Sequence, residues 1–153
     1  MKVFEATRLL KEVVELQATK KMDYDFYMWL ISIKKKVEPT VKDFEEKREV
    51  IQECITDLSV EYCLKDKDGK PVVTKTPTGD IYDGLNRGVN LEYDKKIKEL
   101  VEKGKSLFKE DITIDFTDIK KIKRSVIEKK SKDGEMIVAW DGNKEELLNQ
   151  FIE

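Results

Sequence analysis

A long segment with one narrow apolar face constrains this chain more than any other feature. Across residues 24–62, apolar side chains return at steps of three and four, with Lys, Glu and Asp at many of the positions between them. This spacing gathers the apolar residues on one side of an α-helix. It predicts a long helix within an antiparallel helical hairpin or coiled coil. The apolar positions are Leu30, Ile33, Val37, Val41, Phe44, Ile51, Cys54, Ile55, Leu58 and Tyr62.

Two shorter segments, 3–18 and 91–108, share the same three- and four-residue spacing and predict further amphipathic helices. Asp23 is suited to cap the start of the long helix. Pro39 lacks a backbone N–H and disfavours helical geometry in the residue before it, so a kink or a break is expected near residues 37–39. Gly104 is expected to weaken or end the third helix.

Strand signals are weaker and lie after the long helix. The Asp68-Gly69 pair predicts a hairpin turn between Tyr62–Leu64 and Val72–Thr74, and Pro and Gly mark an irregular stretch up to residue 90. In residues 111–119, apolar and polar side chains alternate, which predicts a strand exposed on one face. The sequence also predicts a turn at Asp133-Gly134 that pairs Ser125–Lys129 with Met136–Trp140, and a short final helix over Lys144–Ile152.

Together these elements predict an α+β protein in which an antiparallel helical hairpin packs with a third helix and a small antiparallel sheet. The length of 153 residues suits a single domain. Within it, the helical hairpin is expected over 1–62, a turn and loop region over 63–90, and the third helix, small sheet and short C-terminal helix over 91–153.

The composition is unusually charged for a folded domain. Charged residues make up 41% and apolar residues 39% of the chain, against about 25% and about 45–50% in ordinary globular domains. The charge is mainly expected on the solvated faces of narrow-seamed helices, so the core should be thin. A thin core makes a protein partner or self-association more probable.

Composition also excludes several kinds of chemistry. The chain has no His, which removes Ser-His-Asp and Cys-His catalysis and Cys/His zinc sites. Cys54 and Cys63 are interpreted as reduced, half-buried thiols. No stretch approaches the roughly 18 apolar residues of a membrane span, and the first residues do not form a signal peptide, so a soluble intracellular protein is expected.

Clusters of acidic residues predict no metal site. Asp66, Asp68 and Gly69 superficially resemble a calcium loop, but the sixth and twelfth positions counted from Asp66 are both Pro. A turn is the better interpretation. A catalytic magnesium site is also disfavoured, because nothing nearby resembles a phosphate-binding loop. The acidic residues considered for it are Asp80, Asp83, Asp111, Asp115 and Asp118.

Nucleic-acid binding is not expected either. The chain has 26 Lys and only 4 Arg, and it carries a net charge of −2, whereas phosphate and base recognition favours Arg. The basic run over 120–132 could contact phosphates, and Lys120, Lys121, Lys123 and Arg124 are its first members. The alternative is a solvated face, or Lys protecting the edge of a sheet.

The densest aromatic cluster opens the long helix, in the sequence YDFYMWLI. Interface cores are enriched in such residues, so a partner-binding surface is one interpretation. The alternative is that these side chains close the end of the hairpin core. The candidates for partner binding are Tyr24, Tyr27, Met28 and Trp29.

The order of elements resembles a family of small uncharacterised proteins from phages and prophages of low-GC Gram-positive bacteria. The resemblance covers residues 1–120: a short helix, the long charged helix, the DKDGKPV turn, then a helix and ITIDFTDI. It implies a viral source and a role in assembly, virion structure or host interaction. The protein is then expected in the host cytoplasm or in the virion.

The sequence therefore favours a non-enzymatic protein that acts through protein–protein contact, without a cofactor or a small-molecule substrate. The first hypothesis is a structural or assembly component of a phage. The alternative is a phage-encoded inhibitor or modulator of a host or anti-phage defence protein. A small metal-dependent enzyme is a third hypothesis, which would require an enclosed pocket with carboxylates.

Overall fold

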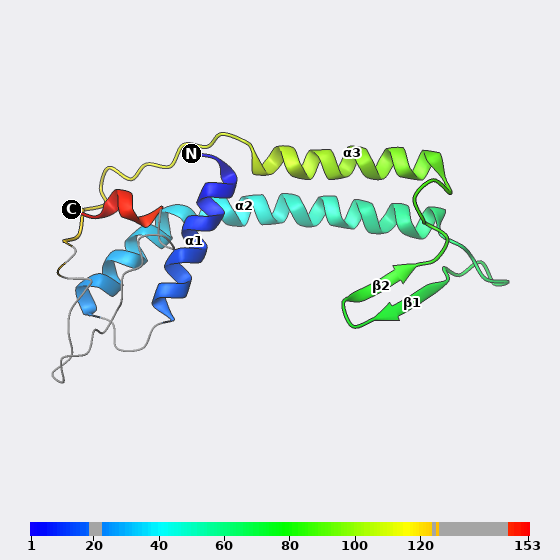
Figure 1. Ribbon diagram of the computed structural model, residues 1–153, viewed down its shortest axis with the longest axis horizontal. Helices are drawn as coiled ribbons and strands as arrows, with labels where there is room; N and C mark the ends of the chain where they lie inside the picture. Colours follow the sequence, from blue (N-terminus) through cyan, green and yellow to red (C-terminus); the bar gives the residue numbers. More distant parts are fainter. Residues whose placement is uncertain (19–22, 124, 126–146) are drawn as a thin grey trace. The chain divides into compact units, whose positions relative to one another are not determined.

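The computed structural model describes residues 1–18, 23–123, 125 and 147–153 (Figure 1). This part of the chain contains three α-helices, one antiparallel strand pair and a short 3-10 helix, which confirms the α+β prediction. The elements are α1 (Val3–Gln17), α2 (Tyr24–Tyr62), β1 (Val73–Thr76), β2 (Gly79–Tyr82), α3 (Leu91–Phe108) and η1 (Leu148–Phe151).

The chain divides into two compact units. The terminal unit contains Met1–Phe44 and Phe108–Glu153, and the middle unit contains Glu45–Leu107. Helix α2 contributes to both, so the division does not follow the predicted segments 1–62, 63–90 and 91–153. It arises because α1, with 15 residues, is much shorter than α2, with 39, and can cover only its first part.

Helix α1 forms where the sequence predicts it. Its buried residues include Ala6, Leu9, Val13 and Leu16, which follow the three- and four-residue spacing of one helix face. The first turn is closed by the Lys2 N–H, which donates a hydrogen bond of 2.7 Å to the Glu5 carboxylate. This bond satisfies one of the backbone donors near the start of the helix, which have no intrahelical partner.

Helix α2 begins as predicted and continues through Pro39. The Asp23 carboxylate accepts a hydrogen bond from the Asp25 N–H at 3.2 Å, as an N-cap residue does. Of the two outcomes expected near 37–39, a kink or a break, the break is wrong, because the helix continues to Tyr62; the kink stays a prediction. Val37 and Val41 are both buried, so the apolar face continues on either side of Pro39 and holds this part of the helix in place.

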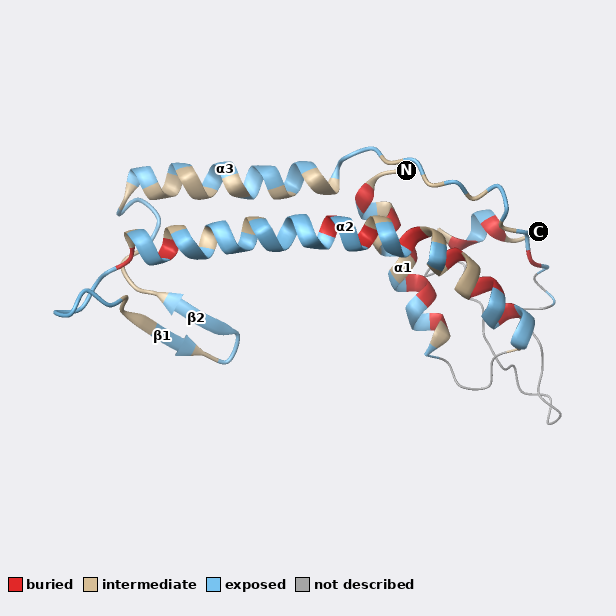
Figure 2. Ribbon diagram, turned by 180° about the vertical axis from the view of Figure 1, so that it is seen from behind, coloured by how far each residue is buried: buried red, intermediate tan, exposed pale blue. Residues whose placement is uncertain are grey.

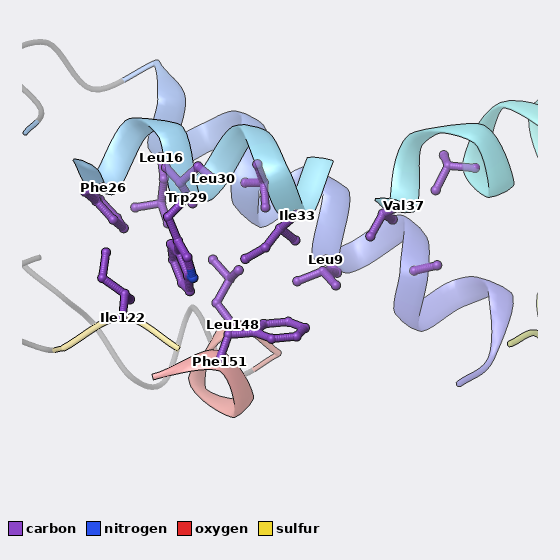
Figure 3. Packing of buried hydrophobic residues seen from close by; sticks show 13 residues of the cluster. Leu9, Leu16, Phe26, Trp29, Leu30, Ile33, Val37, Ile122, Leu148 and Phe151 are labelled. Carbon is purple, nitrogen blue, oxygen red and sulfur yellow. The ribbon is translucent and has the colours of Figure 1, made fainter. Parts of the chain in front are cut away.

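The core of the terminal unit joins α1, the first part of α2 and two segments from the C-terminal third of the chain. Figure 3 shows the side chains of Phe26, Trp29, Ile122, Leu148 and Phe151 gathered in one cluster. Burying a side chain of this size contributes about 1.5–3 kcal/mol. The other members of the buried cluster are Ala6, Leu9, Val13, Leu16, Leu30, Ile33, Val37 and Val41.

Residues 111–119 do not form the predicted strand. Ile112, Ile114 and Phe116 are half-buried and pack against the core, and the polar residues between them are exposed, so the predicted alternation is present. The backbone, however, pairs only through an isolated bridge between Asp111 and Lys2. No neighbouring strand is described along this segment, and without a ladder of hydrogen bonds it stays extended rather than forming a sheet.

Within the terminal unit, the end of the chain is held by a parallel bridge between Ile122 and Ile152. Of the predicted helix over Lys144–Ile152, the structure shows only η1; residues 144–146 lie outside the described part. The predicted hairpin around Asp133-Gly134 lies outside it as well. Leu148 and Phe151 on η1 are buried, so this short element is anchored by apolar packing.

In the middle unit, the strand pair lies later in the chain than predicted. The turn around Asp68-Gly69 is present and is closed by an isolated bridge between Lys65 and Pro71, with Gly69 at φ 76°. Of the predicted pairing of Tyr62–Leu64 with Val72–Thr74, one backbone hydrogen bond is present, from the Val72 N–H to the Leu64 carbonyl at 2.9 Å, and no strand pair is assigned there. Strand β1 pairs instead with β2, from Val73↔Tyr82 to Thr76↔Gly79, within the stretch that the sequence marks as irregular.

Helix α3 lies alongside the second part of α2 (Figure 1), and it continues past Gly104 to Phe108. The expectation that Gly104 ends the helix is therefore wrong, and the expectation that it weakens the helix stays a prediction. No residue of α3 is fully buried. Figure 2 shows buried residues along α1 and the first part of α2, whereas α3 carries only intermediate and exposed ones.

Residues of α1 differ in burial, so truncating their side chains should lower the free energy of unfolding by unequal amounts. We expect Leu9→Ala in α1 to lower the free energy of unfolding by about 2–5 kcal/mol, because Leu9 is fully buried and its removal leaves a cavity. Val14→Ala on the same helix is the matched control, since Val14 is 46% exposed; its effect should stay within about 0.5 kcal/mol. Urea unfolding followed by circular dichroism measures both, and equal effects would contradict the assignment of the core.

Candidate functional site

The Trp29 side chain connects α2 to the segment that carries the predicted basic cluster. Its indole is buried, it stacks on Phe26 with ring centroids 5.7 Å apart, and its Nε1–H donates a 3.1 Å hydrogen bond to the Lys120 carbonyl. Buried Trp usually finds a partner for this N–H. The bond fixes the backbone of residues 120–123 beside the start of α2.

This packing creates a shallow groove, here called the lysine groove, in the terminal unit. It has a volume of about 500 Å³ and is open to solvent. Two residue groups that are far apart in the sequence meet there: the opening aromatic cluster of α2 and the start of the basic run. The residues that line it are Asp25, Met28, Trp29, Ser32, Asp118, Lys120, Lys121, Ile122 and Lys123.

The predicted partner-binding residues divide between core and surface. Trp29 is 7% exposed and belongs to the core, which was the alternative interpretation of the cluster. Tyr24, Tyr27 and Met28 are exposed. Of these three, Met28 lines the lysine groove. Partner binding by the exposed members stays a prediction.

The predicted phosphate contacts Lys120, Lys121 and Lys123 are exposed and lie together on the groove, while Arg124 lies outside the described residues. Acidic residues accompany them. Asp118 lines the same groove and forms a 2.9 Å ion pair with Lys36. The mixture of charges makes the groove a less selective site for phosphate than a purely basic patch would be.

Next to the groove, Asp115 holds a tight turn. Its Oδ1 atom accepts hydrogen bonds from the Thr117 hydroxyl at 2.6 Å and from the Thr117 N–H at 2.9 Å. These bonds, and to a lesser degree the charge of Lys36, hold the pKa of the Asp115 carboxyl below its ordinary value. The charged carboxylate therefore contributes to the order of this segment.

The middle unit contains a polar network where α2 ends and α3 begins. The Tyr62 and Tyr93 rings lie 5.9 Å apart, the Ser59 and Tyr93 hydroxyls are hydrogen-bonded at 3.1 Å, and Lys96 donates to the Tyr62 hydroxyl at 2.9 Å. That hydrogen bond is the main reason why the pKa of Lys96 lies above its ordinary value. The network fixes the two helices at one end of the unit.

Further along, the apolar faces of α2 and α3 are only partly covered. Ile51, Ile55 and Leu58 on α2 and Ile97 and Leu100 on α3 are all half-buried. Within Glu45–Leu107, which the structure describes throughout, Ser59 and Cys63 are the only buried residues. Two helices without a further layer leave their shared apolar surface open at the sides.

One side of this helix pair carries an apolar strip, here called the Val50 stripe, formed by Val50, Ile51, Cys54 and Leu58 on α2. The spacing of one, three and four residues places them on one helix face. Val50 is 58% exposed and Cys54 is also exposed. Such a strip on a folded surface marks an interaction site more often than scattered single residues do.

Two open grooves border the Val50 stripe. One, of about 330 Å³, lies between Cys54 and Leu58 on α2 and Leu100 on α3; the other, of about 820 Å³, includes Ile51 and Leu107. Both are rimmed by Glu99 and by Lys103. The surface therefore combines apolar and charged side chains.

The sequence contained a signal for the Val50 stripe, which its interpretation as a single seam did not use. The predicted seam includes Ile51, Cys54 and Leu58 but not Val50. Val50 widens the apolar face beyond what one neighbouring helix can cover. The width of the apolar face is therefore the signal that the sequence contains for this stripe.

Acidic residues in the described part of the chain form no cluster suited to a metal. Asp66 instead closes its own turn, where its Oδ1 accepts hydrogen bonds from the Asp68 and Lys70 N–H groups, both at 2.9 Å. No group of three or more His, Cys, Asp or Glu side chains is placed to hold an ion there. Among the same residues, no helix has the length and apolar character needed to cross a membrane.

Comparison with known proteins adds no relative. No protein-family model, no curated protein and no solved structure matches this chain.

The two faces of the aromatic cluster predict different results for single substitutions. We expect Trp29→Ala to lower the free energy of unfolding by about 3–5 kcal/mol, because it removes a buried ring and the Lys120 hydrogen bond. Tyr27→Ala should cost about 1 kcal/mol or less, since Tyr27 is 39% exposed. Urea titrations of the two variants make the comparison, and a larger loss for Tyr27→Ala would show that the cluster is oriented differently.

The Asp115 turn predicts a loss of stability in acid. Because folding lowers the pKa of this carboxyl below 3.8, its contribution is present above that value and is lost as the pH falls below it. Asp115→Asn should therefore flatten the fall in melting temperature between neutral pH and the region below 3.8. Thr117→Val keeps the carboxylate but removes one donor, so it should flatten the curve only in part. A wild-type slope in both variants would contradict this role.

Proposed function

We propose that this protein acts through protein–protein contact rather than catalysis, as a structural or assembly component of a phage. The observation that carries the proposal is the middle unit, in which two amphipathic helices share a half-buried apolar face and present the Val50 stripe to solvent. An apolar surface that stays exposed to water does not stabilise a single chain. A partner that covers it removes apolar area from water, which makes association favourable.

The phage setting is supported by the resemblance in element order and by the DKDGKPV turn. A catalytic role has less support. The lysine groove and the two grooves beside the Val50 stripe are open to solvent rather than enclosed. Reactions of polar substrates generally need groups aimed at a reacting atom in a site that excludes water.

Association can be tested with the tagged full-length chain, purified from host cells during phage growth and analysed by sedimentation and mass spectrometry. We expect the protein to be recovered in a stoichiometric complex, either with itself or with a phage protein. Val50→Lys should abolish the complex because it places a charge at the most exposed residue of the apolar stripe. Val14→Lys, at an exposed valine of α1 outside both surfaces, is the control that should retain it.

A stoichiometric complex with a host protein would instead support the alternative of an inhibitor or modulator. A chain that sediments alone as a monomer, both purified and in lysate from infected cells, would contradict the proposed function. Loss of the complex in both valine variants would show that general surface charge, and not the Val50 stripe, controls association.

A further inference from the structure

We propose that the Val50 stripe binds a second copy of this chain, so that two α2–α3 helix pairs join into a four-helix arrangement. The inference rests on the proposed function, since it names the partner of the same surface. It adds that the partner is a second copy related by a two-fold axis. It also names two residues, Val50 and Val101, whose substitution distinguishes this face from the opposite side of the helix pair.

In the described part of the chain, the middle unit lacks a further layer over its two helices. Helix bundles bury their apolar positions between four helices, or between two with a narrow coiled-coil seam. In the middle unit, the face extends beyond a seam, because Val50 and Cys54 are exposed beside the half-buried Ile51 and Leu58. A second helix pair placed on this side would cover all four residues.

The two helices of the middle unit carry net charges of opposite sign. Between Glu45 and Tyr62, six acidic residues stand against two basic ones, whereas α3 carries five lysines and four acidic residues. The part of α2 in the middle unit is thus acidic, and α3 is slightly basic. Opposite charges across an interface favour one pairing and disfavour others, which here means α2 against α3.

A two-fold axis parallel to the helices satisfies this pairing. It places α2 of one copy over α3 of the other and repeats the same contact on both sides, as an isologous interface requires. Neighbouring helices then run in opposite directions, as they do within one chain. Lys96 and Lys103 on the rim of the stripe would face the acidic positions Glu53 and Asp57 of the second copy.

The area available sets the strength of the dimer. The 18 residues of α3 span about 27 Å, and two helices side by side are about 20 Å wide, which gives roughly 500 Å² of face per copy. Two copies bury about 1,000 Å² in total, at the lower limit of specific interfaces. We therefore expect a reversible dimer that dissociates on dilution.

The test is the mass of the purified full-length chain, measured by light scattering after size exclusion over a range of loading concentrations. At about 100 μM, a dimer with a Kd of about 1 μM is almost fully formed. We expect twice the chain mass of 17.9 kDa there, falling towards a single chain on dilution. A monomer at every concentration would overturn the inference.

Two valine substitutions locate the interface. Val50→Lys should give a monomer, because the new charge lies in the stripe opposite the lysines of α3; it also follows Glu46 by four residues, a pairing that favours helix, so folding should be retained. Val101→Lys is the matched control. Val101 is an exposed valine of α3, 40% accessible. It is two residues from both Glu99 and Lys103, which line both grooves, so the helical repeat places it on the opposite side of α3, and its substitution should leave the dimer intact.

Circular dichroism and thermal unfolding show whether each variant is folded. Should Val50→Lys unfold, Cys54→Ser makes the same test with a smaller change, and a clear rise in dissociation constant is expected from it. A dimer that survives Val50→Lys, or one that only Val101→Lys disrupts, would overturn the assignment of this face. A monomeric wild type that still forms a complex in lysate would overturn self-association and leave the proposed function standing.

Discussion

The apolar face of α2 is the feature on which the rest of the structure depends. Its 39 residues extend through both compact units, but the cover over that face differs along its length. In the terminal unit, α1, the 112–122 segment and η1 bury it. In the middle unit, α3 alone covers it, and only by half. One helix thus supplies a complete core in one unit and an incomplete one in the other.

The incomplete core has a physical reason in the composition. A chain with 41% charged residues has too few apolar side chains to form two full cores. Most of the apolar residues that become fully buried are in the terminal unit, where Phe26, Leu30 and Ile33 have no measurable exposure. The middle unit relies on the Tyr62–Tyr93 contact, the hydrogen bond between the Ser59 and Tyr93 hydroxyls and the hydrogen bond that Lys96 donates to Tyr62. These fix geometry more than they exclude water.

The helices could be predicted from the sequence because their apolar spacing is long and regular. Both Pro39 and Gly104 were expected to interrupt them, and neither ends its helix, because packing and length outweigh a local preference. The strands could not be placed as well. Val73–Thr76 and Gly79–Tyr82 are short and mostly exposed, and the 111–119 segment alternates correctly but lacks a partner strand. Pairing depends on distant residues, which a local pattern does not contain.

The candidate surfaces could likewise be predicted only in part. The sequence identified Met28 and the lysines at 120–123 separately, but their meeting in one groove depends on the Trp29–Lys120 hydrogen bond, which joins residues 91 positions apart. The Val50 stripe was visible only as part of a seam, because its exposure depends on how much of α2 the third helix covers. Local spacing shows that a face is apolar, and tertiary packing decides whether it is available.

Hydrogen–deuterium exchange of the full-length chain, compared at low and high protein concentration, tests most directly whether α2 is completed by another molecule. The account predicts that amides in residues 50–58 exchange more slowly at high concentration, while those of α1 do not change. Exchange in residues 50–58 that is independent of concentration and as slow as in the buried part of α2 would contradict it, because the face would then already be covered within one chain.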